Sequence, residues 1–172
     1  KGNIILENVR TDHMTAVIDK LREIGVEINT IGNSARIKGN NLYYNVDITT
    51  LPYPGMPTDM QAQFMALLCT VEGKSIITEK IFTDRFMHVP ELVRMGADIR
   101  VEVSSAIIRG TPCLSGANVM ISDLRAGAGL ALAGLVAKGT TIIDRVYHLD
   151  RGYDRLEERL AKLGAVIKRI HN

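Results

Sequence analysis

The chain contains no tryptophan, and aromatic residues make up only 5% of its 172 residues. It has two cysteines, Cys69 and Cys113, and neither has a histidine beside it in the sequence. Two isolated cysteines form no metal-binding pattern, and they favour a reducing, cytoplasmic setting. No glycine-rich phosphate loop or nucleophile elbow is present either. We therefore expect a protein without a metal site and without a resident cofactor.

Charge and hydrophobicity argue against a nucleic-acid or membrane partner. The net charge is only +2, and no run of lysine or arginine is long enough to form a basic arm. The longest apolar run, from Ala126 to Ala137, is too short and too rich in glycine and alanine to span a bilayer. We expect neither partner, and the length fits one globular domain.

One sequence unit occurs three times along the chain. Each copy begins at a glycine, continues with a β-branched run, an aspartate and a helical stretch, and closes at a second glycine. The two glycines are separated by 23, 23 and 25 residues. The leading glycines are Gly2, Gly73 and Gly139, the aspartates Asp12, Asp84 and Asp150, and the closing glycines Gly25, Gly96 and Gly164. Agreement in spacing and in residue type predicts a repeated structure.

Each position of the unit has a physical interpretation. The β-branched run predicts a strand, the aspartate predicts the N-cap of an amphipathic helix, and the closing glycine suits the left-handed C′ position. A second strand is expected after the closing glycine. Further short strands are expected around 35–38, 46–49, 106–109 and 118–120.

Two more helices are predicted ahead of the second and third copies. Thr58-Asp59 opens a helix over Met60–Val71, and Ser122-Asp123 opens one over Leu124–Ala137. Both are apolar on almost every face, which predicts burial on all sides. The first copy has no such helix, so we expect the chain to be a fragment whose missing helix precedes Lys1.

These elements predict an α/β (α+β) fold. We expect a pseudo-threefold repeat of helix-strand-helix-strand units, with buried helices in the middle and sheets outside. The units cover approximately 2–50, 57–112 and 113–172 of a single domain, 1–172.

Asp59 is the first candidate for chemistry. It stands alone where a proline-rich loop, 51–57, becomes a nearly apolar helix. Such an acid either caps the helix or serves as a general base whose pKa is tuned by burial. The residues alone favour the cap, although the Thr58 hydroxyl could cap instead and free Asp59.

Several basic residues are the next candidates. Arg125 follows Asp123 in the first turn of an apolar helix, where the helix dipole disfavours a cation unless an anion shares the site. Arg85 and Arg151 occupy matching places in the second and third copies, and His13 does so in the first. Their guanidinium groups could converge on a carboxylate or phosphate, or simply lie on the surface. His88 and His148 are read as structural.

Five runs of the sequence resemble one known family. They are Pro57–Phe64 (PTDMQAQF), Arg85–Leu92 (RFMHVPEL), Leu114–Ala117 (LSGA), Asp123–Ala126 (DLRA) and Tyr147–Tyr153 (YHLDRGY). Together they resemble the UDP-N-acetylglucosamine enolpyruvyl transferases, which carry out the first committed step of peptidoglycan synthesis. The resemblance covers essentially the whole chain in order. It implies the inside-out α/β barrel of the enolpyruvyl transferase type, and it identifies the chain as most of the second, C-terminal domain of a two-domain enzyme.

The resemblance also implies a reaction and a set of roles. The enolpyruvyl group of phosphoenolpyruvate passes to the 3′-hydroxyl of UDP-N-acetylglucosamine, and phosphate is released. Asp59 matches the acid proposed to deprotonate the sugar hydroxyl, and Arg125 and Arg151 match arginines that hold phosphoenolpyruvate. Ile81, with Phe82 beside it, matches a position whose backbone contacts the nucleotide sugar. We add Asp123 and Arg85 to the candidate substrate-binding residues.

The same resemblance implies that part of the site lies elsewhere. The family's catalytic cysteine and active-site lysine belong to the N-terminal domain, the expected partner of this chain, and neither Cys69 nor Cys113 matches that cysteine. We therefore expect the chain alone to be inactive. Two alternatives stay open: a shikimate 3-phosphate enolpyruvyl transferase domain, and a catalytically silent assembly domain of the same fold.

Overall fold

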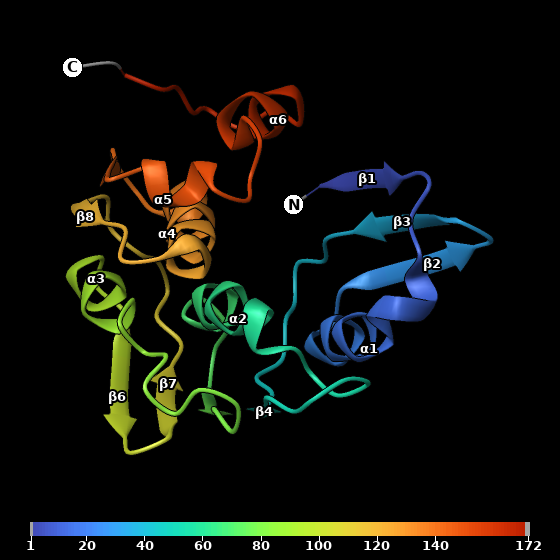
Figure 1. The fold of residues 1–172 in the computed structure, drawn as a ribbon, viewed down its shortest axis with the longest axis horizontal. Coiled ribbons are helices and arrows are strands. Elements are labelled where there is room, and N and C mark those ends of the chain that lie inside the picture. The colour runs from blue at the N-terminus through green and yellow to red at the C-terminus, as the bar shows by residue number, and fades with distance from the viewer. Residues whose placement is uncertain (1, 171–172) are drawn as a thin grey trace.

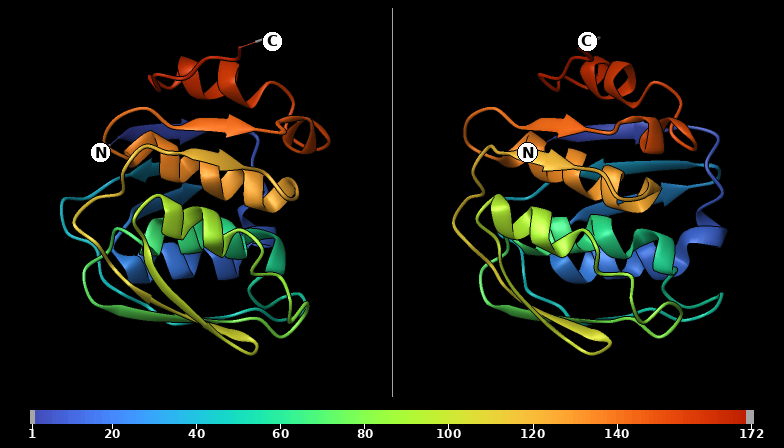
Figure 2. Two further views of the ribbon diagram at one scale, coloured as in Figure 1. Left: turned by 90° about the vertical axis from the view of Figure 1, so that its left-hand side faces the viewer. Right: turned by 60° about the vertical axis from the view of Figure 1, so that its left-hand side comes forward.

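The computed structural model describes residues 2–170 and shows a mixed α/β fold (Figure 1). Two helices, α2 (Gln61–Leu68) and α4 (Leu124–Val136), pack against each other in the interior. Three separate sheets and the remaining helices surround them, as the turned views also show (Figure 2). The prediction of buried helices with sheets outside therefore holds in outline, but the described residues form no closed barrel.

The first sheet has the order β1-β3-β2 and is antiparallel throughout. Its strands are β1 (Asn3–Leu6), β2 (Glu27–Ile31) and β3 (Ser34–Lys38). A short 3-10 helix, η1 (Thr11–Met14), leads into α1 (Thr15–Ile24), which buries Val17 and Ile24 and exposes its charged face. The strand and helix predicted for the first copy are confirmed.

The second sheet repeats this arrangement and adds one strand. Its order is β4-β5-β7-β6, where β5 (Lys74–Thr78), β7 (Ser105–Arg109) and β6 (Asp98–Glu102) are antiparallel. The added strand, β4 (Ile48–Thr49), is shorter than predicted and runs parallel to β5. Helix α3 (Val89–Arg94) connects β5 to β6.

The third sheet is a parallel pair, β8 (Asn118–Met120) and β9 (Ile142–Asp144). Two short helices follow, α5 (Tyr147–Asp150) and α6 (Leu156–Lys162). The strand predicted after Gly164 is wrong: residues 165–170 form no strand, and Val166 is fully exposed. A strand needs a hydrogen-bonded neighbour, and no other described strand lies beside this segment.

Close backbone contact between α2 and α4 defines the interior. A Cβ added at Gly129 of α4 would lie 2.8 Å from the carbonyl oxygen of Ala62 in α2, so only glycine permits this approach. Residues 61–66 of α2 are all buried, as predicted. Helix α2 is shorter than predicted because η2 (Thr58–Met60) forms its first turn and tighter turns follow Leu68.

The last turns of α4 depart from the prediction. Leu132, Leu135 and Val136 are exposed by 41%, 38% and 58%, although complete burial was expected. The preceding residues 126–131 are all buried, since α2 and α5 pack against that part of the helix. Among residues 2–170, no helix is both long and apolar enough to cross a bilayer.

The closing glycines adopt the predicted backbone, but the predicted aspartate caps do not form. Gly25, Gly96 and Gly164 have φ of 107°, 90° and 94°, in the left-handed region. Asp12 instead binds Arg10, and Asp150 binds Arg169, each through two hydrogen bonds. The N-cap position of α3 is His88, four residues after Asp84, and no side chain accepts a hydrogen bond from the first backbone N–H groups of α3. Charged partners within reach of Asp12 and Asp150 outcompete the backbone N–H groups.

His88 is a buried core residue, as read from the sequence, and it predicts a pH-dependent stability. The side chain is 2% exposed, and burial lowers its pKa to about 4, although the charge of Asp123 opposes the shift. The unfolded chain binds a proton near pH 6.5, whereas the folded chain does not. Stability is therefore full above pH 6.5 and falls by about 3 kcal/mol as the pH drops from 6.5 towards 4.

Urea unfolding of the chain between pH 7 and pH 4 measures this dependence. We expect His88→Gln to flatten the curve in that window, whatever its effect at pH 7. The matched control is His148→Gln, since His148 is only half-buried and stacks on Tyr147. Equal slopes for the wild type and His88→Gln would contradict the assignment.

Candidate active site

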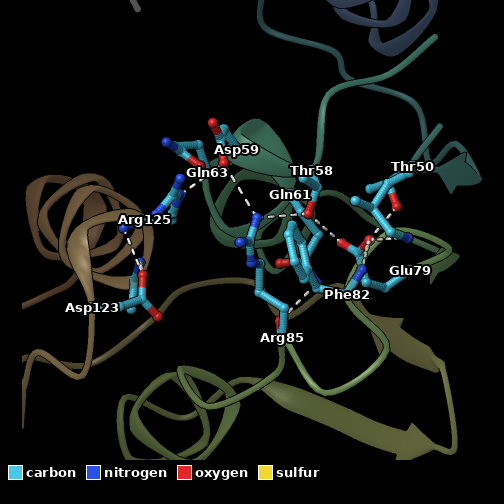
Figure 3. A network of polar contacts seen from close by, with 12 residues as sticks. Thr50, Thr58, Asp59, Gln61, Gln63, Glu79, Phe82, Arg85, Asp123 and Arg125 are labelled. Atoms are coloured by element: carbon cyan, nitrogen blue, oxygen red, sulfur yellow. Dashed lines mark hydrogen bonds and ion pairs between the residues drawn. The ribbon is translucent and has the colours of Figure 1, made fainter. Parts of the chain in front are cut away.

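Asp59 forms the centre of an ion-pair cluster at the start of α2 (Figure 3). Its Oδ1 accepts a hydrogen bond from Arg125 Nε at 2.7 Å and another from Arg85 Nη1 at 3.2 Å. The side chain remains 60% exposed, so the carboxylate is still open to solvent. The interpretation of Asp59 as a helix cap is wrong, because η2 begins after Pro57 without any side-chain cap.

The hydroxyl-acid pairs of the second and third copies therefore differ in what they do. Asp123 is the N-cap of α4: its Oδ1 accepts from the backbone N–H groups of Arg125 and Ala126 at 2.7 and 3.0 Å. In the second copy neither residue caps. Thr58 donates its hydroxyl hydrogen to Glu79 instead, so the alternative of a Thr58 cap is also wrong.

Arg125 links α4 to α2 across the cluster. It lies in the first turn of α4, where the helix dipole disfavours a cation, and the Asp59 carboxylate supplies the compensating anion. The hydrogen bond from Arg125, with the charges of Arg125 and Arg85, lowers the pKa of Asp59 against the opposing effect of partial burial. The same hydrogen bond raises the pKa of Arg125. Asp59 is therefore ionised at neutral pH.

Arg85 is held from several sides. Its Nη1 donates to the Thr58 hydroxyl at 2.8 Å as well as to Asp59, and its guanidinium carbon lies 4.1 Å from the centre of the Phe82 ring. The side-chain amide of Gln61 donates to the Arg85 carbonyl at 3.1 Å. Only 18% of the Arg85 side chain is exposed. The surface interpretation of Arg85 is wrong, since its guanidinium faces Asp59.

Arg151 lies at the same end of α4 but outside this hydrogen-bonded cluster. It follows α5 directly, and the next residue, Gly152, lies so close to Leu124 that an added Cβ would come within 2.7 Å of its Cδ2. The Tyr153 hydroxyl then accepts a hydrogen bond from Gln63 of α2 at 3.2 Å. Within residues 2–170 the exposed Arg151 side chain makes no hydrogen bond or ion pair.

Ile81 and Phe82 form a turn after β5 that faces the cluster. Their backbone N–H groups donate to Glu79 Oε1 at 2.8 and 3.1 Å. His13 lines a groove together with Pro57 and Met60, but Asp59 is not among the residues that line it. His13 contacts Arg10 and Asp12 and does not join the arginines at Asp59.

A model of one protein family matches residues 1–160, and its description is EPSP synthase (3-phosphoshikimate 1-carboxyvinyltransferase). The chain belongs to the EPSP synthase family.

Relatives within this family are close in sequence but much longer. The protein of Desulfosudis oleivorans is 55% identical over 170 residues, which is 99% of this chain and 41% of the relative. That of Gluconacetobacter diazotrophicus is 57% identical over 169 residues, which is 98% of this chain and 40% of the relative. Both relatives bear the name UDP-N-acetylglucosamine 1-carboxyvinyltransferase. The chain thus spans about two fifths of their length.

Solved structures of the family share the fold. The enolpyruvyl transferase NikO of Streptomyces tendae has a TM-score of 0.89 and 28% identity, over 98% of this chain and 40% of that protein. EPSP synthase of Acinetobacter baumannii has a TM-score of 0.62 and 20% identity, over 83% of this chain and 35% of that protein. The second likeness shows the fold alone.

In this member of the EPSP synthase family, the polar cluster around Asp59 continues to Glu79 and Thr50, which were not predicted from the sequence. Glu79 is completely buried and accepts hydrogen bonds from the hydroxyl groups of Thr50 and Thr58. Burial pushes the pKa of Glu79 up, but the hydrogen bonds outweigh it and lower that pKa overall. The only signal was its place in the repeat, because an acid also ends the first strand in the other two copies, as Glu7 and Asp144.

The two cysteines lie outside this cluster. Both are free, and burial raises the pKa of Cys69 to about 12, so its thiol is not ionised at neutral pH. The described residues contain no group of three or more His, Cys, Asp or Glu side chains arranged to hold a metal ion.

Proposed function

We propose that the chain is part of a transferase that moves the enolpyruvyl group of phosphoenolpyruvate to the 3′-hydroxyl of UDP-N-acetylglucosamine. The observation that carries the proposal is the partly exposed Asp59 carboxylate held by two arginines from separate segments. Such a cluster combines a proton acceptor with two planar donors suited to carboxylate or phosphate. The names of the close relatives support the choice of substrates.

The reaction takes place by addition and then elimination. The sugar hydroxyl loses its proton to Asp59 and forms a bond from its oxygen to C2 of phosphoenolpyruvate, while C3 takes a proton from an acid of the proposed other domain. In the tetrahedral intermediate that results, C2 carries both the sugar oxygen and the phosphate. C3 then returns a proton to that group, the bond from C2 to the phosphate oxygen breaks, and the double bond is restored as phosphate leaves.

Asp59 is a weak base while both arginines hold it, because its pKa is lowered. A substrate anion that binds the remaining N–H groups of Arg125 and Arg85 offsets part of the positive charge that acts on Asp59. The pKa of Asp59 then rises, and its carboxylate accepts the hydroxyl proton more readily. Arg151, at the same end of α4, is the third proposed anion ligand. Asp123, Ile81 and Phe82 remain proposed contacts for the substrates.

We further propose that the chain is most of the second of two domains. In the complete protein, the pseudo-threefold repeats close into the inside-out barrel, and the other domain supplies the remaining catalytic groups. The two free cysteines, Cys69 and Cys113, agree with a cytoplasmic location. The chain by itself then turns over no substrate.

A chimera tests the proposal directly. This chain replaces the matching 41% of the Desulfosudis oleivorans relative, and phosphate release is assayed with phosphoenolpyruvate and UDP-N-acetylglucosamine. We expect turnover by the chimera and none by the chain alone. Shikimate 3-phosphate serves as the competing acceptor, because the family model and the Acinetobacter baumannii structure are described as EPSP synthase.

Each outcome of the chimera assay favours a different alternative. Turnover only with shikimate 3-phosphate replaces the proposed acceptor. No turnover with either acceptor, from a chimera that is folded by circular dichroism, favours the silent assembly domain. Turnover by the isolated chain contradicts the two-domain proposal.

A further inference from the structure

The buried carboxylate of Glu79 has no buried counterpart in the other two repeats. The corresponding acids at the ends of β1 and β9, Glu7 and Asp144, are both exposed. Only Glu79 is completely buried, and burial of a charge is costly unless hydrogen bonds compensate for it. Its Oε1 accepts from the Thr50 hydroxyl and from the amides of Ile81 and Phe82, and its Oε2 accepts from Thr58.

A chain of hydrogen bonds links Glu79 to Asp59 through Thr58 and Arg85 (Figure 3). The donors and acceptors in this chain can be arranged in only one way. A guanidinium can only donate and a carboxylate can only accept, so the Thr58 hydroxyl must accept from Arg85 and donate to Glu79. Arg85 Nη1 uses its two hydrogens for Thr58 at 2.8 Å and for Asp59 at 3.2 Å. The orientation of Arg85 towards Asp59 therefore depends on where Glu79 points the Thr58 hydroxyl.

We propose that Glu79 is a positioning residue for the site of the proposed transferase. Through Thr58 it holds the Arg85 guanidinium against Asp59, and through two backbone amides it sets the turn of Ile81 and Phe82. Glu79 touches no reacting atom, and its effect passes through these two routes. The inference rests on the proposed function for its effect on catalysis, but the geometry that it describes is independent of the reaction.

Glu79→Gln disturbs this arrangement in either orientation of the amide. With the amide nitrogen towards Thr58, the hydroxyl must accept from it, and the hydroxyl hydrogen loses its partner. With the nitrogen towards Ile81 and Phe82, donors face donors. Thr58→Val keeps the shape of the side chain but removes the hydroxyl that joins Glu79 to Arg85, and Thr58→Ser keeps the hydroxyl.

In the chimera we expect Glu79→Gln and Thr58→Val each to lower kcat about tenfold, since each removes a hydrogen bond to a charged group. The double variant falls no further than Glu79→Gln alone, and Thr58→Ser recovers most of the activity lost in Thr58→Val. Glu79→Gln also raises KM for the nucleotide sugar, because it alone loosens the turn of Ile81 and Phe82. The matched control is Glu7→Gln, which leaves kcat and KM unchanged.

A spectroscopic readout does not depend on turnover. In the chimera with 15N-labelled arginine, we expect the Arg85 Nη hydrogens to be resolved, because two acceptors hinder rotation of that group. In Glu79→Gln and Thr58→Val we expect the separate signals of the Arg85 Nη hydrogens to merge into one, and in Glu7→Gln we expect them to stay resolved. Failure of the proposed function leaves this NMR result unchanged, so the two failures are distinguishable.

Two results overturn the inference. One is a loss of kcat in the double variant that equals the combined losses of Glu79→Gln and Thr58→Val and that parallels the loss of thermal stability. The other is an Arg85 Nη signal in Glu79→Gln that matches the wild type. If Glu79→Gln does not fold, the comparison of Thr58→Val with Thr58→Ser decides on the same two readouts.

Discussion

Replacement of Asp59 by asparagine is expected to lower kcat of the chimera by about 10²- to 10⁴-fold, the usual contribution of a general base. The asparagine carbonyl can still accept the hydrogen bond from Arg125 that Asp59 Oδ1 accepts at 2.7 Å. Shape and ion placement therefore change little, but an amide cannot take up the hydroxyl proton. Steady-state phosphate release with saturating substrates measures the loss.

The size of the loss and its selectivity both matter. KM for each substrate should change far less than kcat, because the loss lies in proton transfer. Asp19→Asn is the control, since Asp19 is an exposed acid on the outer face of α1 that pairs with Arg22. A decrease in kcat below tenfold, or an equal decrease in the control, would contradict the role of Asp59 as the base.

Substitution of Arg125 by lysine is expected to lower kcat/KM for phosphoenolpyruvate by about 10²- to 10³-fold, the usual cost of losing a charge-stabilising donor. The charge survives, but lysine presents a single ammonium group in place of a planar fork with five donors. Arg125 uses Nε for Asp59, and its other nitrogens are the proposed donors to the anion. The lysine must then abandon one of the two partners.

Titration of phosphoenolpyruvate at saturating nucleotide sugar measures this effect. Arg159→Lys is the matched control, because Arg159 forms an exposed ion pair with Asp154 on α6, away from Asp59. We expect no change in that variant. An unchanged kcat/KM in Arg125→Lys would remove Arg125 from the proposed anion site.

The first strand of each repeat and the C-terminal ends of the helices that follow were the most predictable part of the fold. A β-branched run carries its preference in each residue, and β1, β5 and β9 lie where such runs predicted them. The closing glycines were equally clear, since a backbone with positive φ favours glycine whatever surrounds it. These features depend on a few neighbouring residues and hence appear in the sequence.

Two of the three aspartates that stand next to a helix start were predicted wrongly, because arginine side chains bind them in place of the helix backbone. Asp12, Asp59 and Asp123 each stand next to a helix start, and each looks like an N-cap. Only Asp123 caps, whereas Asp12 binds Arg10 and Asp59 binds two arginines. An ionised arginine within reach competes successfully with a backbone N–H, and the sequence does not show which arginines are within reach.

The missing strand after Gly164 and the exposed end of α4 have a related cause. Both segments are apolar enough to be buried, but burial and strand formation need another segment alongside. Residues 165–170 pair with no strand among residues 2–170, and the side chains of Leu132, Leu135 and Val136 are only partly covered there. An apolar pattern indicates only that a segment can be covered.

The sequence by itself determined the repeat, most of the strands, the left-handed glycines and, through its resemblance to the family, the candidate site residues. Tertiary structure alone decided that Asp59 is an ion-paired acid and Glu79 a buried one. The contacts responsible join Asp59 to residues 26 and 66 positions away, and Glu79 to residues 21 and 29 positions away. Backbone preferences are local, whereas the partner and the burial of a charged side chain depend on which distant segments the fold brings together.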